Sequence, residues 1–298
     1  MLDDHSPLAQ ALAEKLRRRD RLKDVQTPLP RRTRVLTLSN QKGGVGKTTT
    51  TVNLAAALSR RGARVLVIDF DPQGNASTAL GVEHGADSDS IYDVLIGEKT
   101  LAEVMQQSTD HENLWVVPST IHLAGTEIEL VGTQRREYHL VDALEKLAED
   151  QRAQNTQPFH YILIDCPPSL GLLTINAFVA ATEVVIPIQC EYYALEGLSQ
   201  LIGNIDLIQQ HLNPDLKLST IVLTMYDSRT RLSAEVAEEV REHFPEQTLE
   251  AVIPRSVRVS EAPSHGKTVL AYDPNNSASI AYLEAAHEIA TRYDQEEN

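Results

Sequence analysis

Two lysines flank a cluster of glycines in the stretch SNQKGGVGKTTTTVN, residues 39–53. The GKT at 46–48 matches the end of the phosphate-binding pattern G-x-x-x-x-G-K-[ST]. In that pattern backbone N–H groups surround a polyphosphate, the lysine reaches the outer phosphates and the hydroxyl binds Mg²⁺. The pattern's first glycine is replaced by Gln41, and the next position carries the additional Lys42. The sequence therefore predicts a deviant phosphate loop with one more lysine than a single loop needs.

Carboxylates stand at the ends of two further apolar runs. VIDFDPQGN contains Asp69 and Asp71, and YILIDCPPSLG contains Asp165. A single aspartate after a strand is usually a turn former, but three beside a phosphate loop favour a metal and water site. Mg²⁺ prefers hard oxygen ligands and keeps several waters, so we expect Asp165 to act with the Thr48 hydroxyl at the metal. Asp71 is expected to hold an attacking water, and the proline-containing loop at 167–171 to sense the γ-phosphate.

The surrounding sequence supplies the elements that such a loop requires. RVLTLS, residues 34–39, is typical of a short buried strand, and KTTTTVNLAAALSRRG has the spacing of a helix that ends at Gly62. An anion at the N-terminus of that helix is stabilised by unpaired N–H groups and by the helix dipole. Further strands are predicted at 63–71, 113–119, 159–167, 183–189 and 216–225, and further helices at 139–150, 195–212 and 233–244.

This alternation of apolar strands and helices predicts an α/β fold. It is the pattern of a doubly wound, mostly parallel sheet with helices on both faces. In such sheets a ligand lies outside the carboxyl ends of the strands, where Lys47, Asp71 and Asp165 are expected. The sequence shows no internal repeat and no low-complexity stretch.

Composition limits the class of protein. The chain has 298 residues, 42% hydrophobic content and a net charge of -15, which by itself argues against nucleic acid as a partner. Its two cysteines, Cys166 and Cys190, have no CxxC spacing, which fits a reducing compartment and argues against a disulfide framework or a zinc site. The N-terminus lacks the features of a signal peptide and no apolar run approaches a membrane span. We therefore expect a cytoplasmic protein without a membrane partner.

The first 32 residues differ in charge from the rest. They carry eight lysines and arginines against five aspartates and glutamates, a net charge of +3, whereas residues 33–298 carry -18. Leu8, Leu12 and Leu16 are spaced four apart beside the run RRRDR, which predicts a short amphipathic helix before a proline-containing linker. We expect residues 1–32 to form a basic extension and residues 33–298 the nucleotide-binding domain. The extension is either a solvated tail or an arm that binds DNA or a partner.

From about Arg34 to Arg292 the chain resembles the ParA family of ATPases, which segregate chromosomes and plasmids and have deviant Walker A motifs. The resemblance rests on KGGVGKTTT for the phosphate loop, DFDPQGNAS for the first switch, ILIDCPPSLG for Walker B and the second switch, and IPRSVRVSEAPSHGK near the C-terminus. It implies an ATPase that requires ATP and Mg²⁺ and forms a dimer with the nucleotides between the subunits. In such dimers a signature lysine reaches the partner's phosphates. Lys42 occupies that position, which leaves Lys47 to act in its own subunit.

The same resemblance assigns roles to other residues. Asp71 corresponds to the water-positioning aspartate, Thr48 to the Mg²⁺ ligand, and Asp165 to the Walker B carboxylate, which binds Mg²⁺ through a water. Met225 and Pro254 match positions that border the adenine. No [NT]KxD stretch, with which GTPases read guanine, is present, and this favours ATP. The loop residues implied to hold the nucleotide are Gly43, Gly44, Val45, Gly46, Lys47, Thr48 and Thr49.

Non-specific binding of double-stranded DNA by the ATP-bound dimer is also implied by the resemblance. The candidate residues are Arg229, Arg231, Arg255, Arg258 and Lys267. Acidic groups outnumber basic ones between residues 225 and 270, so only clustering of these side chains on one face would create a DNA site. The alternative is a solvated face with arginine–carboxylate pairs. The resemblance further implies a ParB-like centromere-binding protein as activator and a nucleoid-associated location, with a polar anchoring protein as a candidate partner of the extension.

Three other functions share parts of this pattern. A MinD-like regulator of division-site placement needs a basic amphipathic C-terminal helix for the membrane, whereas this sequence finishes with the acidic ATRYDQEEN. An iron–sulfur protein of the same fold needs paired cysteine ligands, and Cys166 and Cys190 are more simply read as small buried residues. A scaffold protein would use ATP only to assemble. We therefore predict an ATPase that segregates chromosomes or plasmids, with the MinD-like and scaffold functions as alternatives.

Overall fold

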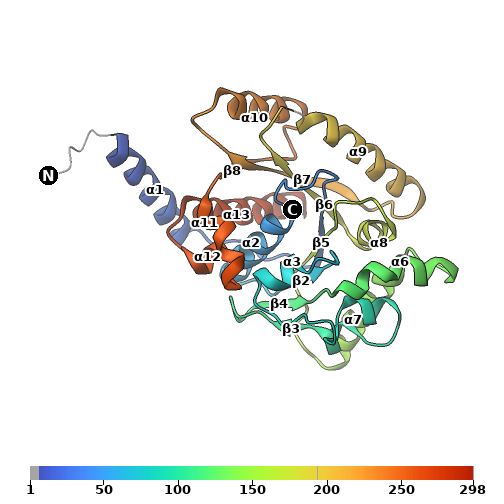
Figure 1. Cartoon of the computed structure of the whole chain (residues 1–298). Helices are drawn as coiled ribbons and strands as arrows, with labels where there is room; N and C mark the ends of the chain where they lie inside the picture. The colour runs from blue at the N-terminus through green and yellow to red at the C-terminus, as the bar shows by residue number, and fades with distance from the viewer. Residues whose placement is uncertain (1–6, 193, 298) are drawn as a thin grey trace.

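The computed structural model describes residues 7–192 and 194–297 and shows an eight-stranded sheet with helices on both of its faces (Figure 1). The strands are β1 (Arg34–Leu38), β2 (Val65–Asp69), β3 (Gln106–Gln107), β4 (Leu114–Val117), β5 (Tyr161–Asp165), β6 (Glu183–Gln189), β7 (Lys217–Tyr226) and β8 (Thr248–Pro254). The longer helices are α1 (Pro7–Asp24), α2 (Lys47–Arg60), α7 (His139–Ala153), α8 (Leu172–Ala180), α9 (Ala194–His211), α10 (Arg231–His243) and α13 (Ser277–Glu297). The short ones are α3 (Asn75–Ala79), α4 (Ile91–Leu95), α5 (Leu101–Val104), α6 (Thr126–Glu129), α11 (Val257–Glu261) and α12 (Val269–Tyr272), with the 3-10 helices η1 (Ile121–Gly125), η2 (Leu130–Gly132) and η3 (Ala262–His265).

The strands lie in the order β3-β4-β2-β5-β1-β6-β7-β8, and among the described residues only the β3–β4 pair is antiparallel. The chain fills one side of β1 first and then crosses to the other side with β6. The predicted doubly wound, mostly parallel α/β fold is therefore confirmed. Because β1, β2 and β5 are neighbours and parallel, the loops that follow them meet at one edge of the sheet.

Successive side chains along the central strands point to opposite faces of the sheet. On β2, Val65 and Val67 pack with α2 and α13, whereas Leu66 and Ile68 pack with α4, α5, α7 and α8. Helices α8, α9 and α10 cover the continuation of that second face beside β6 and β7. The near-continuous apolar sequence of these strands thus follows from burial on both faces.

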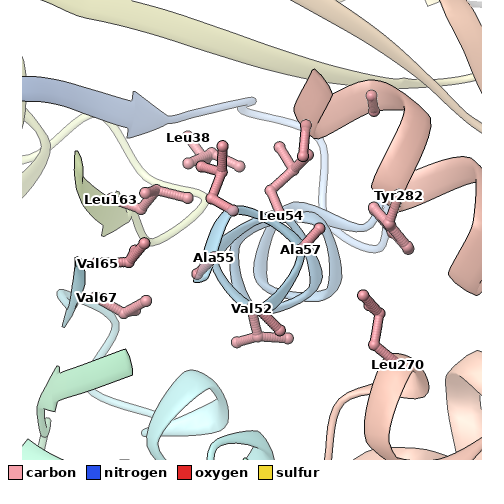
Figure 2. Close-up of a cluster of buried hydrophobic side chains, with 14 of the residues drawn as sticks. Leu38, Val52, Leu54, Ala55, Ala57, Val65, Val67, Leu163, Leu270 and Tyr282 are labelled. Carbon is pink, nitrogen blue, oxygen red and sulfur yellow. The ribbon is translucent and has the colours of Figure 1, made fainter. Parts of the chain in front are cut away.

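Helix α2 is the central element of the first face. It is enclosed by strand side chains such as Leu38 and Leu163 on one side and by Tyr282 of α13 and Leu270 of α12 on the other (Figure 2). Ala55, like the adjacent alanines of α2, is fully buried and allows this close packing. Because α2 starts at the phosphate loop, this packing fixes the position of the loop.

The predicted strands and helices of the nucleotide-binding part are all confirmed within a few residues. Several further elements were not predicted. The strands β3 and β8 were not predicted, because β3 is two residues long and β8 is an edge strand that contains Glu250 and ends at Pro254. Helices α3 to α6 span four or five residues each, which is too short for a periodic pattern. Helices α8, α11, α12 and α13 were also not predicted.

The extension forms the predicted helix, α1, and its last turn packs on the rest of the chain. Leu22 is buried, and its carbonyl accepts a hydrogen bond of 2.6 Å from Arg61. Arg18 pairs with Glu284 of α13, and the Thr27 hydroxyl lies 3.2 Å from the ring of His287. The first turns of α1 project away from the body (Figure 1). Residues 1–6 of the extension lie outside the described residues, and the boundary at residue 32 stays a prediction.

A buried ion pair at the amino ends of β1 and β6 gives a test of the fold. Arg34 donates two hydrogen bonds of 2.7 Å to the carboxylate of Glu183, and both side chains are almost fully buried. Replacing one partner leaves the other charge buried without compensation, so we expect Arg34→Met to lower the free energy of unfolding by about 3–5 kcal/mol. Urea titration measures this change. The double variant Arg34→Met/Glu183→Met is the control and should recover most of the stability; an Arg34→Met protein as stable as the wild type would contradict the assignment.

Candidate nucleotide and magnesium site

The phosphate loop joins the end of β1 to the first residue of α2. Gly44 and Gly46 have φ angles of 76° and 88°, in the left-handed region that favours glycine. The loop is anchored on both sides, because the Asn40 amide donates 2.9 Å to a carbonyl of β6 and the Thr224 hydroxyl of β7 donates 2.8 Å to the carbonyl of Val45. In the described structure nothing lies within 4 Å of a Cβ built at Gly43 or Gly44. The loop thus has fixed ends and an open, glycine-lined centre that can surround phosphates.

The two lysines of this loop have different environments. Lys47 is 7% exposed at the first turn of α2, and its Nζ donates to the carbonyl of Lys42 at 3.4 Å. Burial lowers the pKa of Lys47, while the nearby Asp165 and Asp71 oppose this shift. The side chain of Lys42 is 44% exposed, and its Nζ lies 3.3 Å from Glu191 in the loop after β6. Lys47 is therefore buried beside the phosphate loop, whereas Lys42 is at the surface.

Asp165 lies at the end of β5, paired in register with Leu38 of β1 and Asp69 of β2. The carboxylate is fully buried, and its Oδ1 accepts a hydrogen bond of 2.9 Å from the Thr51 hydroxyl. Its Oδ2 has no hydrogen-bond partner among the described residues. Burial and the charge of Asp69 raise the pKa of Asp165, while the Thr48 and Thr51 hydroxyls oppose the shift.

These features fit Mg²⁺. An unpartnered oxygen of a buried carboxylate beside the hydroxyl of Thr48 is a donor set of hard oxygens, and a cation there would lower the cost of ionising Asp165. Among the described residues no group of three or more His, Cys, Asp or Glu side chains could hold a metal ion by itself. A cation at this position would therefore depend on the nucleotide's phosphates and on water for its other ligands.

Asp69 and Asp71, two residues apart, have separate tasks. Asp69 is fully buried and accepts hydrogen bonds of 2.8 and 2.7 Å from the backbone and hydroxyl of Ser77, at α3. Ser119, after β4, donates from its backbone to the same Ser77 hydroxyl at 3.1 Å. Asp69 thus holds the first switch loop onto the sheet, and its carboxylate is already occupied.

Asp71 is carried by the loop that Asp69 secures. Its Oδ1 accepts from the backbone of Gln73 at 3.0 Å, and its carbonyl accepts from Gly74 at 2.9 Å, which closes a tight turn. Gly74 has a φ of 64°, and a Cβ at this position would lie 3.0 Å from the ring of His84. The turn leaves Asp71 within electrostatic range of Lys47, at the same sheet edge as the phosphate loop.

Met225 lies near the end of β7, next to the phosphate loop. It has a φ of 52°, which is uncommon for a residue other than glycine, and its Cε is 3.9 Å from a Cβ built at Gly46. Pro254 closes β8 and is paired in register with Tyr226. Both residues predicted to border the adenine thus lie on the same side of the loop, and the unusual backbone of Met225 is of the kind found at functional sites.

The basic residues predicted to bind DNA fall into two groups. Arg229 and Arg231 follow β7, and Arg255 and Arg258 follow the neighbouring strand β8, so all four follow adjacent strand ends and are exposed. Lys267 instead lines a hollow of about 380 Å³ together with Thr48, Thr49 and residues of α3 and η3. Its position beside the phosphate loop makes the nucleotide a second candidate partner for Lys267.

Several residues of the site carried no clear sequence signal. Asn40 and Thr224 anchor the loop, Thr51 binds Asp165, and Ser77 binds Asp69. Thr51 stands four residues after Lys47, on the same face of α2, and this spacing together with its polarity in an apolar helix was the available hint. The contact between Glu191 and Lys42 could not be predicted from local sequence, because the fold brings together two segments that are far apart in the chain.

The two cysteines are small buried residues in this structure. Cys166 and Cys190 are free, and burial raises their pKa to about 12 and about 11. Within the described part of the chain, no helix is long and apolar enough to cross a membrane.

Comparison with known proteins identifies a matching family and related sequences. Residues 33–218 match the model of a family described as AAA domain. The chain is 51% identical over 257 residues to the sporulation initiation inhibitor protein Soj of Bacillus subtilis, covering 86% of this chain and 98% of Soj. It is 52% identical over 259 residues to the chromosome partitioning protein ParA of Caulobacter vibrioides, covering 87% and 94%.

Among solved structures, cobyrinic acid a,c-diamide synthase of Mycobacterium smegmatis with bound ADP and magnesium is 37% identical. Its TM-score is 0.74, and the match covers 89% of this chain and 97% of that one. The cell division ATPase MinD of Pyrococcus furiosus is 27% identical, with a TM-score of 0.67 and coverage of 88% and 98%.

The fold and the loop define an ATPase of the P-loop class that uses ATP and Mg²⁺. Within that class, the chain belongs to the ParA/Soj family of chromosome-partitioning proteins. The predicted family, enzyme class and cofactors are thereby confirmed.

Proposed function

We propose that the chain forms a dimer with ATP between its subunits, and that this dimer binds DNA and is released by hydrolysis. The observation that carries the proposal is the different placement of the two lysines. Lys47 is buried at its own loop, whereas Lys42 is exposed and contacts a surface carboxylate, that of Glu191, at 3.3 Å. A lysine at the mouth of the loop can exchange such a surface contact for the phosphates of a second subunit. This supports the role in trans that the family resemblance implies.

For hydrolysis we propose a division of labour among the loops at the carboxyl edge of the sheet. The loop from Gly43 to Thr49 binds the phosphates, and Lys47 neutralises their charge. Thr48, and Asp165 through a water, hold Mg²⁺, which stabilises the charge that develops on the transferred phosphoryl group. Asp71 positions the attacking water, because its turn is secured by Asp69 and it lies near Lys47. Met225 and Pro254 border the adenine.

For the DNA-bound state we propose that Arg229, Arg231, Arg255 and Arg258 contact phosphates of unrelated sequences. They follow the neighbouring strands β7 and β8 and are exposed. The dimer would then coat the nucleoid in the cytoplasm until a ParB-like centromere-binding protein stimulates hydrolysis. The extension is proposed to add contacts to DNA or to a polar anchoring protein through the basic run at 17–21 of α1, in which Arg18 is paired with Glu284 of α13.

DNA retention in different nucleotide states tests this function. The protein is passed over immobilised DNA without nucleotide and with ADP, ATP or a non-hydrolysable ATP analogue, each at two salt concentrations. We expect the protein to be retained with the analogue and, to a smaller extent, with ATP. Retention should fall steeply as the salt concentration rises, because phosphate contacts release counterions. Retention that is independent of nucleotide would contradict the proposed cycle.

Charge reversal of the arginines tests the proposed DNA surface. Replacing Arg229, Arg231, Arg255 or Arg258 singly by glutamate is expected to weaken binding about equally for unrelated duplexes, because phosphate contacts carry no base information. The slope of log K against log salt should become shallower by about 1 for each arginine–phosphate pair removed. Fluorescence anisotropy over a salt series measures both. Arg152→Glu is the matched control, since Arg152 is exposed on α7, far from α10 (Figure 1). Weaker binding to one sequence only would contradict phosphate recognition.

The two alternative functions, a MinD-like regulator and a scaffold protein, have less support from these observations. The relatives at about half identity include chromosome partitioning proteins, whereas the MinD structure is 27% identical. A scaffold that uses ATP only to assemble would show no turnover stimulated by DNA and a partner protein, so a phosphate-release assay with both present separates it from the proposed function.

A further inference from the structure

Arg229, one of the arginines proposed to bind DNA, is held by a carboxylate of its own loop. Its Nε and one terminal nitrogen donate hydrogen bonds of 2.9 and 2.7 Å to the two oxygens of Asp227. The backbone of Arg229 donates a third, of 3.0 Å, to the same carboxylate. The Arg229 side chain is 85% exposed, whereas that of Asp227 is 21% exposed. The guanidinium is thus accessible to a ligand but already neutralised by a well-positioned bidentate partner.

Asp227 also acts on a second arginine of this surface. Tyr226 and Pro254 are paired in register, and the backbone of Arg255 donates to the carbonyl of Tyr226 at 3.0 Å, so Arg255 stands beside the loop of Asp227. The hydrogen bonds from Arg229, together with the charges of Arg229 and Arg255, lower the pKa of Asp227 to about 2. Asp227 is therefore a permanent negative charge between two of the proposed DNA contacts.

The other two arginines have weaker partners. Arg231 lies 3.2 Å from Glu235 one turn along α10, and Arg258 lies 2.9 Å from Glu261 in α11. In each pair both side chains are more than 40% exposed and only one pair of atoms is in contact, and such pairs contribute little. The Arg258 guanidinium also lies 5.9 Å from the centre of the Tyr272 ring. Asp227 differs from them because it binds its arginine through two short bonds and is itself largely shielded.

We propose that Asp227 sets the DNA affinity of this surface, because a DNA phosphate must displace it from Arg229 and must approach Arg255 against its charge. The inference rests on the proposed binding of DNA by these arginines. It explains how a surface with several arginines can hold DNA weakly enough for the protein to be released. The free energy of each new arginine–phosphate contact is reduced by that of the arginine–carboxylate contact that it replaces.

The test is the affinity of Asp227→Asn for a short fluorescent duplex in the presence of a non-hydrolysable ATP analogue. Asparagine keeps the oxygen that accepts from the Arg229 backbone, so the turn is retained, but it removes the charge. Releasing Arg229, whose side chain is 85% exposed, is expected to tighten binding about two- to fivefold per subunit. A symmetric dimer presents two copies, so the expected gain is about four- to twenty-fivefold.

A double-mutant cycle separates release of Arg229 from a general effect of charge. In an Arg229→Ala background, Asp227→Asn should give a markedly smaller gain, because only the effect on Arg255 and the direct repulsion between Asp227 and the phosphates remain. Glu242→Gln, which removes one charge from the neighbouring helix α10, is the control for long-range repulsion and should give a smaller gain than Asp227→Asn. Thermal unfolding of each variant confirms that the fold is intact.

The outcomes distinguish this inference from the proposed function. If the wild type binds DNA and Asp227→Asn binds no tighter, or if the full gain persists in the Arg229→Ala background, the role of Asp227 is wrong while DNA binding stands. If the wild type shows no nucleotide-dependent DNA binding at all, the proposed function fails and the role of Asp227 fails with it.

Discussion

The Asp71→Ala protein is expected to bind ATP and Mg²⁺ as the wild type does and to release phosphate about 10²- to 10⁴-fold more slowly, the range associated with a positioned catalytic group. The reason is the separation of tasks at the end of β2. Asp69, through Ser77, fixes the switch loop on the sheet, so removal of the Asp71 side chain leaves the loop and the phosphate cradle in place. The substitution removes only the group proposed to orient the attacking water.

Phosphate release and nucleotide affinity are measured on the same preparation. Asp71→Asn is the matched control, because an amide oxygen can still accept the hydrogen bond from Gln73 at 3.0 Å but carries no charge. Both variants should be slow if the carboxylate is needed, and both should remain on DNA with ATP, since the dimer would persist. Wild-type turnover in either variant contradicts the assignment, and failure to bind ATP would show that Asp71 supports the loop instead.

The phosphate loop and the central strands could be predicted because their signals are local. The glycines at 43, 44 and 46, the lysines and the flanking strand and helix all lie within a short stretch, and burial on both faces makes β1, β2, β5 and β6 nearly continuous apolar runs. Register then follows from the parallel sheet. Asp165 and Asp69 both stand at the carboxyl end of an apolar run, so their position opposite each other could be predicted from the sequence.

Other features of the site depend on contacts between distant segments. Nothing local distinguishes Asp69 from Asp71; the difference arises because Ser77 donates to Asp69, and the Ser77 hydroxyl in turn accepts from the backbone of the distant Ser119. The position of Lys267 beside Thr48 and Thr49 depends on how η3 packs against α3 and α2. Periodicity along one segment cannot supply such information.

The arginine–carboxylate pairs could be predicted in part from local sequence spacing and in part only from the structure. Arg229 with Asp227, Arg231 with Glu235 and Arg258 with Glu261 are two, four and three residues apart. These spacings allow contact in a turn or a helix, so the pairs were foreseeable as alternatives to DNA contacts. The sequence did not show which pair has the shortest contacts and the least exposed carboxylate, because this depends on the turn that follows β7.

The second large effect concerns Lys42. In the Lys42→Gln protein we expect each monomer to bind ATP and the ATP-dependent dimer to fail. The substitution leaves the loop intact, because the Lys42 backbone still donates 3.0 Å to Asn40 and Lys47 remains in place. It removes the cation proposed to cross to the partner's phosphates. Truncating one member of a charged interface pair costs about 2–5 kcal/mol. A two-fold dimer contains two such pairs, so the dimer should be weakened by about 10³-fold or more.

Sedimentation velocity with a non-hydrolysable ATP analogue, alongside a nucleotide titration, measures the two properties separately. Glu191→Gln is the control, since it removes the carboxylate that pairs with Lys42 in its own subunit and should leave the dimer at least as stable. Lys47→Ala is the contrasting variant, because its charge contacts phosphates in the ground state and ATP binding itself should weaken. If Lys42→Gln dimerises like the wild type, the role in trans is wrong. If it cannot bind ATP, then Lys42 belongs to the site of its own subunit. In that case the loop would have to close on the nucleotide to bring the exposed Lys42 side chain to the phosphates, without a second chain.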